Sequence, residues 1–188
     1  MKEHLGSCSF GEKITEEVKI DCLHISCGEK FTMGEMLDHL KNIHKSCEHP
    51  AYRKVNTRRW LWPLDLLQST SLNWTPEIAS YKNQTFLLHA CVRDHTWWVF
   101  LVTLLGREEE AEKYEVNMSI RKKAGQHFSM EFRGKVFGTE EPIKDILKDS
   151  KNGLRLINSL AHVNENGEPN FTIEYQIICK KKANSNSK

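Results

Sequence analysis

The chain has 188 residues, 39% hydrophobic and 28% charged, which is enough for one ordinary globular core and a small appended module. Its net charge of +2 excludes the strong general attraction to polyanions that a highly basic protein shows. The longest apolar run, WWVFLVTLL at 97–105, is too short to span a bilayer, and the first residues lack the apolar core of a signal peptide. We therefore expect a cytoplasmic or nuclear protein without a membrane anchor.

A loose lead-in, residues 1–20, precedes a compact pattern of cysteines and histidines within residues 21–47. The pattern has the spacing C-x4-C-x11-H-x4-H and consists of Cys22, Cys27, His39 and His44. It offers two thiolates and two imidazoles to one tetrahedral ion, so we predict a zinc finger that binds one zinc. Cys47 is an alternative to His44 as the fourth ligand. The cysteines form no dense disulfide framework, which favours reduced thiols.

A short helix is predicted to carry the histidines. Thr32 followed three residues later by Glu35 is the signature of a capping box, and apolar residues at helical spacing follow. Two histidines five residues apart lie roughly 140° apart around an ideal helix, so we expect a distorted last turn at 42–44. The exposed positions before the first histidine are Gly34, Glu35 and Asp38, and their two acids disfavour a base-reading helix. A structural zinc site is the better interpretation.

Residues 48–80 are expected to connect the finger to a second unit, because their prolines argue against a long regular element. From residue 81 the apolar pattern has a period of two, which predicts short strands. The runs that carry it are 85–92, 97–105, 114–120, 127–132 and 171–179. The lack of β–α–β alternation favours an antiparallel sandwich over 81–180, before a disordered tail at 181–188. Its predicted interior is Tyr114, Val116, Met118, Phe128, Met130, Phe132, Phe171, Ile173, Tyr175 and Ile177.

Two pairs of neighbouring residues in the first strands are candidates for function. Trp97 and Trp98 are adjacent, so only one can face inward from a strand, and the other is a candidate anchor for a protein interface. His89 and Cys91 share a face, but no third group to orient them is evident, so we do not expect catalysis.

These segments together resemble the substrate-binding region of the seven-in-absentia (SIAH/SINA) ubiquitin ligases. The resemblance spans residues 21–179 and rests on the finger spacing ending in HKS, on LLG followed by the charged REEEAEKY segment, and on the ENG turn before the last strand. It implies a TRAF-like antiparallel sandwich that dimerises and captures degradation-motif peptides. The family's RING domain needs eight zinc ligands, which residues 1–20 do not offer, and the family's first finger is also missing. We therefore expect no ubiquitin transfer by this chain itself, as in a fragment or a RING-less relative.

The resemblance also implies where partners bind. The stretch after the finger corresponds roughly in position to the strand that lines the family's peptide groove, although its composition differs. Its candidates for peptide contact are Val55, Arg59, Trp60 and Trp62. Core tryptophans and a solvated arginine are the competing interpretation.

Two functions from different classes remain open. The first is a non-catalytic module that binds protein partners for ubiquitin-dependent degradation, or an adaptor that pairs with a RING-bearing ligase subunit, and that forms a homodimer. The second is a nucleic-acid-associated finger protein whose basic stretch YRKVNTRRW, residues 52–60, grips RNA or DNA, with the sandwich as a dimerisation scaffold. Salt separates them, because phosphate contacts weaken steeply with ionic strength.

Overall fold

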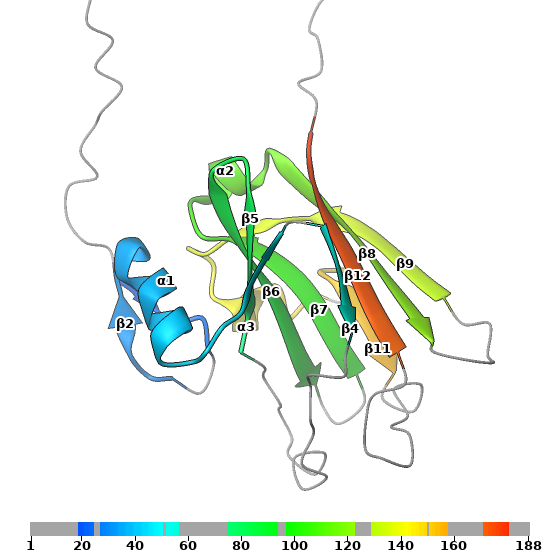
Figure 1. Cartoon of the computed structure of the whole chain (residues 1–188), viewed down its shortest axis with the longest axis horizontal. Coiled ribbons are helices and arrows are strands. Elements are labelled where there is room, and N and C mark those ends of the chain that lie inside the picture. Colours follow the sequence, from blue (N-terminus) through cyan, green and yellow to red (C-terminus); the bar gives the residue numbers. More distant parts are fainter. Residues whose placement is uncertain are drawn as a thin grey trace, which may run out of the picture.

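The computed structural model describes residues 19–24, 27–50, 52–56, 75–93, 97–122, 129–149, 151–157 and 171–180. They form a small finger with one helix, followed by two β-sheets stacked on each other (Figure 1). The predicted fold class is confirmed, because the protein is mainly β, its sheets are largely antiparallel, and a cysteine–histidine cluster lies near its N-terminus. Within the described ranges, no helix combines the length and the apolar character needed to cross a bilayer.

The larger sheet contains six strands. They are β3 (Glu48–Pro50), β5 (Glu77–Tyr81), β6 (Gln84–Arg93), β7 (Trp97–Leu104), β10 (Phe137–Gly138) and β11 (Leu154–Ile157). The two apolar runs predicted as a hairpin are β6 and β7, which pair from Phe86 opposite Leu104 to Arg93 opposite Trp97. Two of the contacts in this sheet are parallel, β3 with β5 and β10 with β7, although the sequence predicts antiparallel pairing throughout.

The smaller sheet has four antiparallel strands in the order β4-β12-β8-β9. They are β4 (Tyr52–Asn56), β8 (Tyr114–Lys122), β9 (Ser129–Lys135) and β12 (Phe171–Cys179). Every one of these pairings is antiparallel, as the period of two in the sequence predicts. Strands β4 and β9 form the two edges of this sheet.

The main core fills the space between the two sheets. Alternate residues of β6, β7, β8 and β12 meet there, because successive side chains of a strand point to opposite faces. The predicted interior residues within the described ranges all belong to this cluster, with Met130 and Phe132 half-buried at its margin. Phe128 lies outside the described residues.

A second apolar cluster covers the outer face of the six-stranded sheet. The sheet contributes Leu87, Val99 and Leu101, and helix α1 (Met33–Asn42) contributes Met36 and Leu40, both with no exposed surface. Helix α3 (Ile143–Ile146) packs into the same cluster, whereas α2 (Glu108–Ala111) contributes Ala111 to the main core. The finger is therefore packed onto the sandwich through a shared core.

The segment predicted as a connection contributes strands to both sheets. Strand β3 joins the six-stranded sheet and β4 joins the other, with a single position, 51, between them. Pro50 ends β3, and an edge strand such as this tolerates a proline because it need not donate to a further neighbour. The residues that directly follow the finger are therefore already strands of the two sheets.

Candidate metal centre

Two short strands bring the cysteines together. Strand β1 (Ile20–Asp21) pairs antiparallel with β2 (Lys30–Phe31), and Cys22 N–H donates to the carbonyl oxygen of Glu29 at 2.8 Å. The N–H of Cys27 donates to His24 O at 2.8 Å, which closes a turn between the two strands. Both cysteines consequently lie in the segment that joins the two strands of one small hairpin.

Helix α1 supplies the histidines. The predicted capping box is present: Glu35 N–H donates to Thr32 Oγ1, and Thr32 N–H donates to a Glu35 carboxylate oxygen at 3.1 Å. The helix ends at Asn42, and Lys45 has a positive φ of 58°. His44 therefore lies beyond the helix, where the chain has already turned. Because the helix ends before His44, the two histidines, five residues apart, can reach one point. The departure from helical geometry lies where the sequence predicts a distorted last turn.

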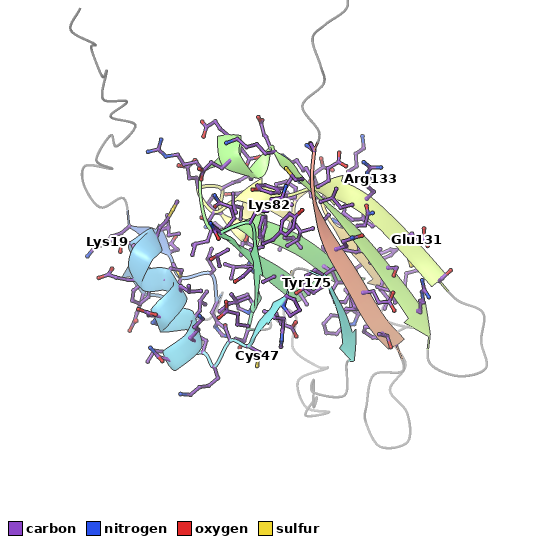
Figure 2. All side chains as sticks on the ribbon, turned by 45° about the horizontal axis from the view of Figure 1, so that its top comes forward. Lys19, Cys47, Lys82, Glu131, Arg133 and Tyr175 are labelled. Carbon is purple, nitrogen blue, oxygen red and sulfur yellow. The ribbon has the colours of Figure 1, made fainter. Side chains whose placement is uncertain are left out.

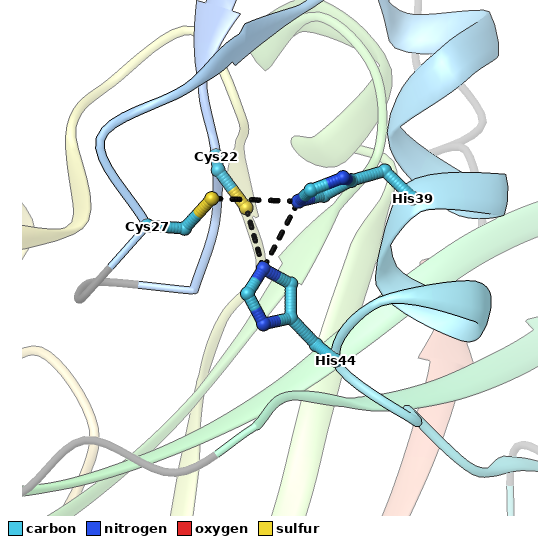
Figure 3. Close-up of side chains that lie close together, drawn as sticks. All are labelled: Cys22, Cys27, His39 and His44. Atoms are coloured by element: carbon cyan, nitrogen blue, oxygen red, sulfur yellow. Dashed lines mark hydrogen bonds between the residues drawn. The ribbon is translucent and has the colours of Figure 1, made fainter.

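The four side chains converge on one point (Figure 3). Their ligand atoms all lie within 4.8 Å of one another. The Cys22 Sγ to His44 Nε2 and Cys27 Sγ to His39 Nε2 distances are both 3.5 Å, and the two Nε2 atoms are 3.0 Å apart. A tetrahedral ion with ordinary zinc–sulfur and zinc–nitrogen bonds holds such atoms about 3.3–3.8 Å apart. The two sulfur–nitrogen separations fall within this range and the two nitrogens lie slightly closer, so small shifts of the side chains would place all four around one tetrahedral ion.

Neighbouring groups orient the ligands. The Phe31 ring stacks on His39 with ring centroids 3.9 Å apart, and the His24 ring stacks on His44 at 4.1 Å. The backbone N–H of His24 points to Cys22 Sγ at 3.4 Å, a contact that stabilises a thiolate. A carboxylate oxygen of Glu29 lies 4.0 Å from Nδ1 of His39, where it favours presentation of Nε2 to the ion.

Ionisation of the ligands couples metal binding to pH. Burial raises the pKa of Cys22 to about 11, and the neighbouring Cys27 and Glu29 add to this shift. Burial, together with the charge of His39, lowers the pKa of His44 below its ordinary value. At neutral pH the imidazole is already neutral, whereas the thiol must lose its proton to the solvent before its sulfur can bind the metal. Metal affinity therefore increases with pH.

The structure separates Cys47 from this group. Its side chain is exposed, and its Sγ lies 3.9 Å from the carbonyl oxygen of Lys45 rather than near the other thiols. Among the described residues, His44 is thus the fourth member of the cluster. The five described cysteines are all free thiols, as the sequence predicts.

The predicted partner-binding residues fall in three places. Val55 lies in the edge strand β4, whereas Arg59, Trp60 and Trp62 lie outside the described residues. Trp97 is half-buried at the start of β7. The remaining candidate, Trp98, is 1% exposed inside the main core. Trp98 is therefore the member of the pair that faces inward, and Trp97 stays the candidate for the interface anchor.

His89 and Cys91 share a face, as predicted, but both are buried on the outer side of the six-stranded sheet. His89 is buried and its Nε2 is 2.9 Å from Thr103 Oγ1, while the Cys91 thiol points to the carbonyl oxygen of Val99. Burial lowers the pKa of His89 to about 3. The sequence does not signal Thr103 as its partner, because that contact depends on the register of two strands.

The four side chains together would complete a tetrahedral set and leave no coordination position for water or a substrate. Such closed sites hold folds together, whereas catalytic zinc sites keep a position for water.

No model of a known protein family matches the chain, and no curated protein sequence matches it.

Proposed function

We propose that this chain is a zinc-stabilised protein-binding module of the seven-in-absentia type. It recognises partner peptides destined for ubiquitin-dependent degradation, or acts as a RING-less adaptor for a ligase subunit. Zinc is the metal because two thiolates and two imidazoles in a tetrahedron suit its softness and geometry. The ion is structural, and the chain's role is binding rather than catalysis.

The observation that carries this proposal is the shared core of finger and sandwich. The apolar face of α1, with Met36 and Leu40, packs against the six-stranded sheet. Its exposed face carries Gly34, Glu35 and Asp38, whose two carboxylates repel phosphate. A finger with its apolar face buried and an acidic free face supports a scaffold role and not the reading of bases.

The edge of the smaller sheet at strand β4 supports peptide binding. Strand β4 is the first strand of the smaller sheet and pairs on one side with β12. No described strand pairs with its other side, so its outward N–H and C=O groups suit an extended peptide that adds as a strand. Val55 belongs to this edge, and we extend the peptide site from it to Arg59, Trp60 and Trp62.

The metal is tested by elemental analysis of the purified protein. We expect one zinc per chain, lost in Cys22→Ala and His39→Ala. Cys47→Ala is the matched control, because this neighbouring exposed thiol lies outside the cluster and its loss should leave the zinc content unchanged. Fully folded protein without metal would contradict the assignment.

Peptide binding is tested by selecting short random peptides on immobilised zinc-loaded protein. Selected peptides should bind with a shallow dependence on salt. Val55→Pro, which removes a backbone N–H from strand β4, and the Arg59→Glu, Trp60→Ala double variant should each weaken binding at least tenfold. Glu112→Arg, an exposed charge change at the end of α2, is the control. Binding of nucleic acid with a steep salt dependence, and of no peptide, would favour the other class of function.

A further inference from the structure

A cleft of about 560 Å³ lies where the finger meets the sandwich. One wall belongs to the metal-binding hairpin, and the other is the turn at 139–144 that leads from β10 into α3. Its rim is open to solvent, because Lys19, Gly28 and Glu140 are exposed around it. Small molecules in solution can therefore enter between the finger and the sandwich.

The cleft reaches the cysteine side of the candidate metal centre. Cys22 and Cys27 line it, whereas His39 and His44 are not among the described residues that do. Figure 3 shows that the cysteines come from the hairpin and the histidines from helix α1 and the turn after it. The Phe31 ring also stacks on His39. The open approach to the centre is thus toward sulfur.

The charges around the cleft favour an uncharged ligand. Three bases and three acids line it, namely Lys19, Lys30, Lys144, Asp21, Glu140 and Glu141. Lys30 and Asp21 pair with each other at 3.2 Å. The inner part of the cleft is apolar, with Leu23 and Ile143 buried there. A balanced rim of this kind attracts neither anions nor cations from a distance.

The two cysteines differ in their surroundings. Cys22 is 6% exposed, and its sulfur accepts the N–H of His24 at 3.4 Å. Cys27 is half-buried, and no described backbone N–H points to its sulfur. A hydrogen bond to a thiolate stabilises its charge and so lowers its nucleophilicity. Cys27 is therefore both the more accessible sulfur and the more reactive one.

We propose that Cys27, with Cys22 as the second thiol, is a site of oxidation by a small uncharged hydroperoxide that enters this cleft. The inference rests on the zinc of the proposed function, because a metal deprotonates the thiols that bind it. The thiolate is the form that a peroxide oxidises, and accessible thiolates beside a second cysteine are the most susceptible.

The reaction has two steps. The Cys27 thiolate attacks the terminal oxygen of the hydroperoxide, so a sulfur–oxygen bond forms, the oxygen–oxygen bond breaks, and the released alkoxide or hydroxide takes a proton from the solvent. The Cys22 thiolate then attacks the sulfur of this sulfenic acid and displaces hydroxide, which takes a second proton. The two sulfurs together lose two electrons, and the peroxide gains them. The products are a disulfide, water and the alcohol or a second water.

The geometry makes Cys22 the thiol that completes the reaction. The ligand atoms of the centre all lie within 4.8 Å of one another, so rotation of the two side chains brings the sulfurs together. Cys47 is an exposed thiol outside the cleft, and Figure 2 shows it at the opposite end of the finger from Lys19, which lines the cleft. A disulfide no longer supplies two thiolates, so oxidation releases the metal.

The experiment follows zinc release from the full chain with a coloured zinc indicator after addition of hydrogen peroxide. We expect the zinc to leave together with formation of a disulfide between Cys22 and Cys27. Both cysteines fall in the tryptic peptide 20–30, which should lose two hydrogens and resist alkylation. A thiol reductant with added zinc should restore the zinc content.

Two glycines provide matched variants. An added Cβ meets no atom within 4 Å at Gly28, which lines the cleft, or at Gly34, which is exposed on α1 and does not line it. Gly28→Phe should obstruct the cleft and slow zinc release at least about fivefold, because thiol oxidation follows access. Gly34→Phe should release zinc at the wild-type rate. Glu141→Phe, on the opposite wall, is a second obstruction and lies outside the finger.

The zinc content before addition of peroxide separates the two proposals. Wild-type protein that contains no zinc contradicts the proposed function itself. Zinc-loaded protein that keeps its metal while Cys47 is oxidised overturns only this inference. Release at the same rate in Gly34→Phe and in both obstructed variants also overturns it, as does a disulfide that joins Cys27 to any cysteine other than Cys22.

Discussion

A single buried imidazole makes the covered outer face of the large sheet sensitive to acid. His89 is buried on this face with its Nε2 2.9 Å from the Thr103 hydroxyl, and burial lowers its pKa to about 3. An unfolded histidine has a pKa near 6.5. The folded state therefore holds this side chain neutral. As the pH falls, the unfolded state binds a proton at His89 that the folded state does not bind, so the folded state loses stability.

We expect this group to contribute stability that is complete above about pH 6.5 and is lost as the pH falls towards 3, because the depressed pKa belongs to the folded state. At pH 5 the loss is about 2 kcal/mol. Denaturant unfolding at pH 7.5 and pH 5 measures it. His89→Gln keeps a hydrogen-bonding group beside Thr103 but does not titrate, so it should lose about 2 kcal/mol less between these pH values. Since the metal ligands titrate in both proteins, an equal loss in both would refute the role of His89.

Ile173 tests the register of the main core. It has no exposed surface and pairs with Ile120 across β12 and β8. Ile173→Ala should cost about 2–5 kcal/mol in the free energy of unfolding, as for other truncated core aliphatics. Ile178→Ala, the same kind of truncation at a half-buried position of the same strand, should cost clearly less. A loss below about half a kcal/mol at Ile173 would show that its burial is misassigned.

Helix α1 is the element whose sequence and structure agree most closely. The Thr32–Glu35 pair predicts where the helix begins, and both reciprocal hydrogen bonds of the capping box are present. Such local signals are legible in sequence because partners three residues apart are fixed by the helix itself.

Removal of this cap should loosen the metal centre. Thr32→Ala should cost about 1 kcal/mol and weaken zinc binding, because the helix that positions His39 begins there. Thr32→Ser keeps the accepting oxygen and should recover most of the loss. Unfolding curves with and without zinc compare the two variants. Equal behaviour of the serine and alanine variants would show that the hydroxyl does not matter.

The strands show where prediction from sequence stops. The long strands β8 and β12 alternate clearly, and their interior residues follow from that alternation. The short strands β3 and β10 have too few residues to show a period, and their parallel pairing depends on distant neighbours. The burial of every position from Trp98 to Leu104 in β7 reflects a cover on both sheet faces. The sequence shows that apolar run, but it does not show which elements cover the two faces of β7.

At the scale of the molecule, the metal centre anchors a cover for the sheet. Cys22 and Leu40 belong to the same apolar cluster as Leu87 and Val99 of the sheet. Release of the metal frees the two cysteines and the histidines from each other, so the finger loses the constraint that closes it. The part of the outer sheet face that the finger covers would then meet water.

Chelation of zinc should therefore destabilise the whole chain and not only the finger. A metal held with high affinity adds a few kcal/mol to stability, so we expect the melting temperature to fall by about 10 °C with a chelator present. Binding of a dye specific for exposed apolar surface should rise in parallel. Cys22→Ala should melt near the lower temperature and should not respond to the chelator. Identical melting of the wild type with and without chelator would contradict this coupling.

The passage from β3 to β4 also has a mechanical consequence. These consecutive strands belong to different sheets and are separated by one residue, with β3 held along β5 and β4 held along β12. Tension that enters through the finger therefore loads hydrogen bonds in both sheets in immediate succession. Resistance to forced unfolding depends on the rate at which such bonds give way. A protein tethered by its finger would carry load through the junction of its two layers.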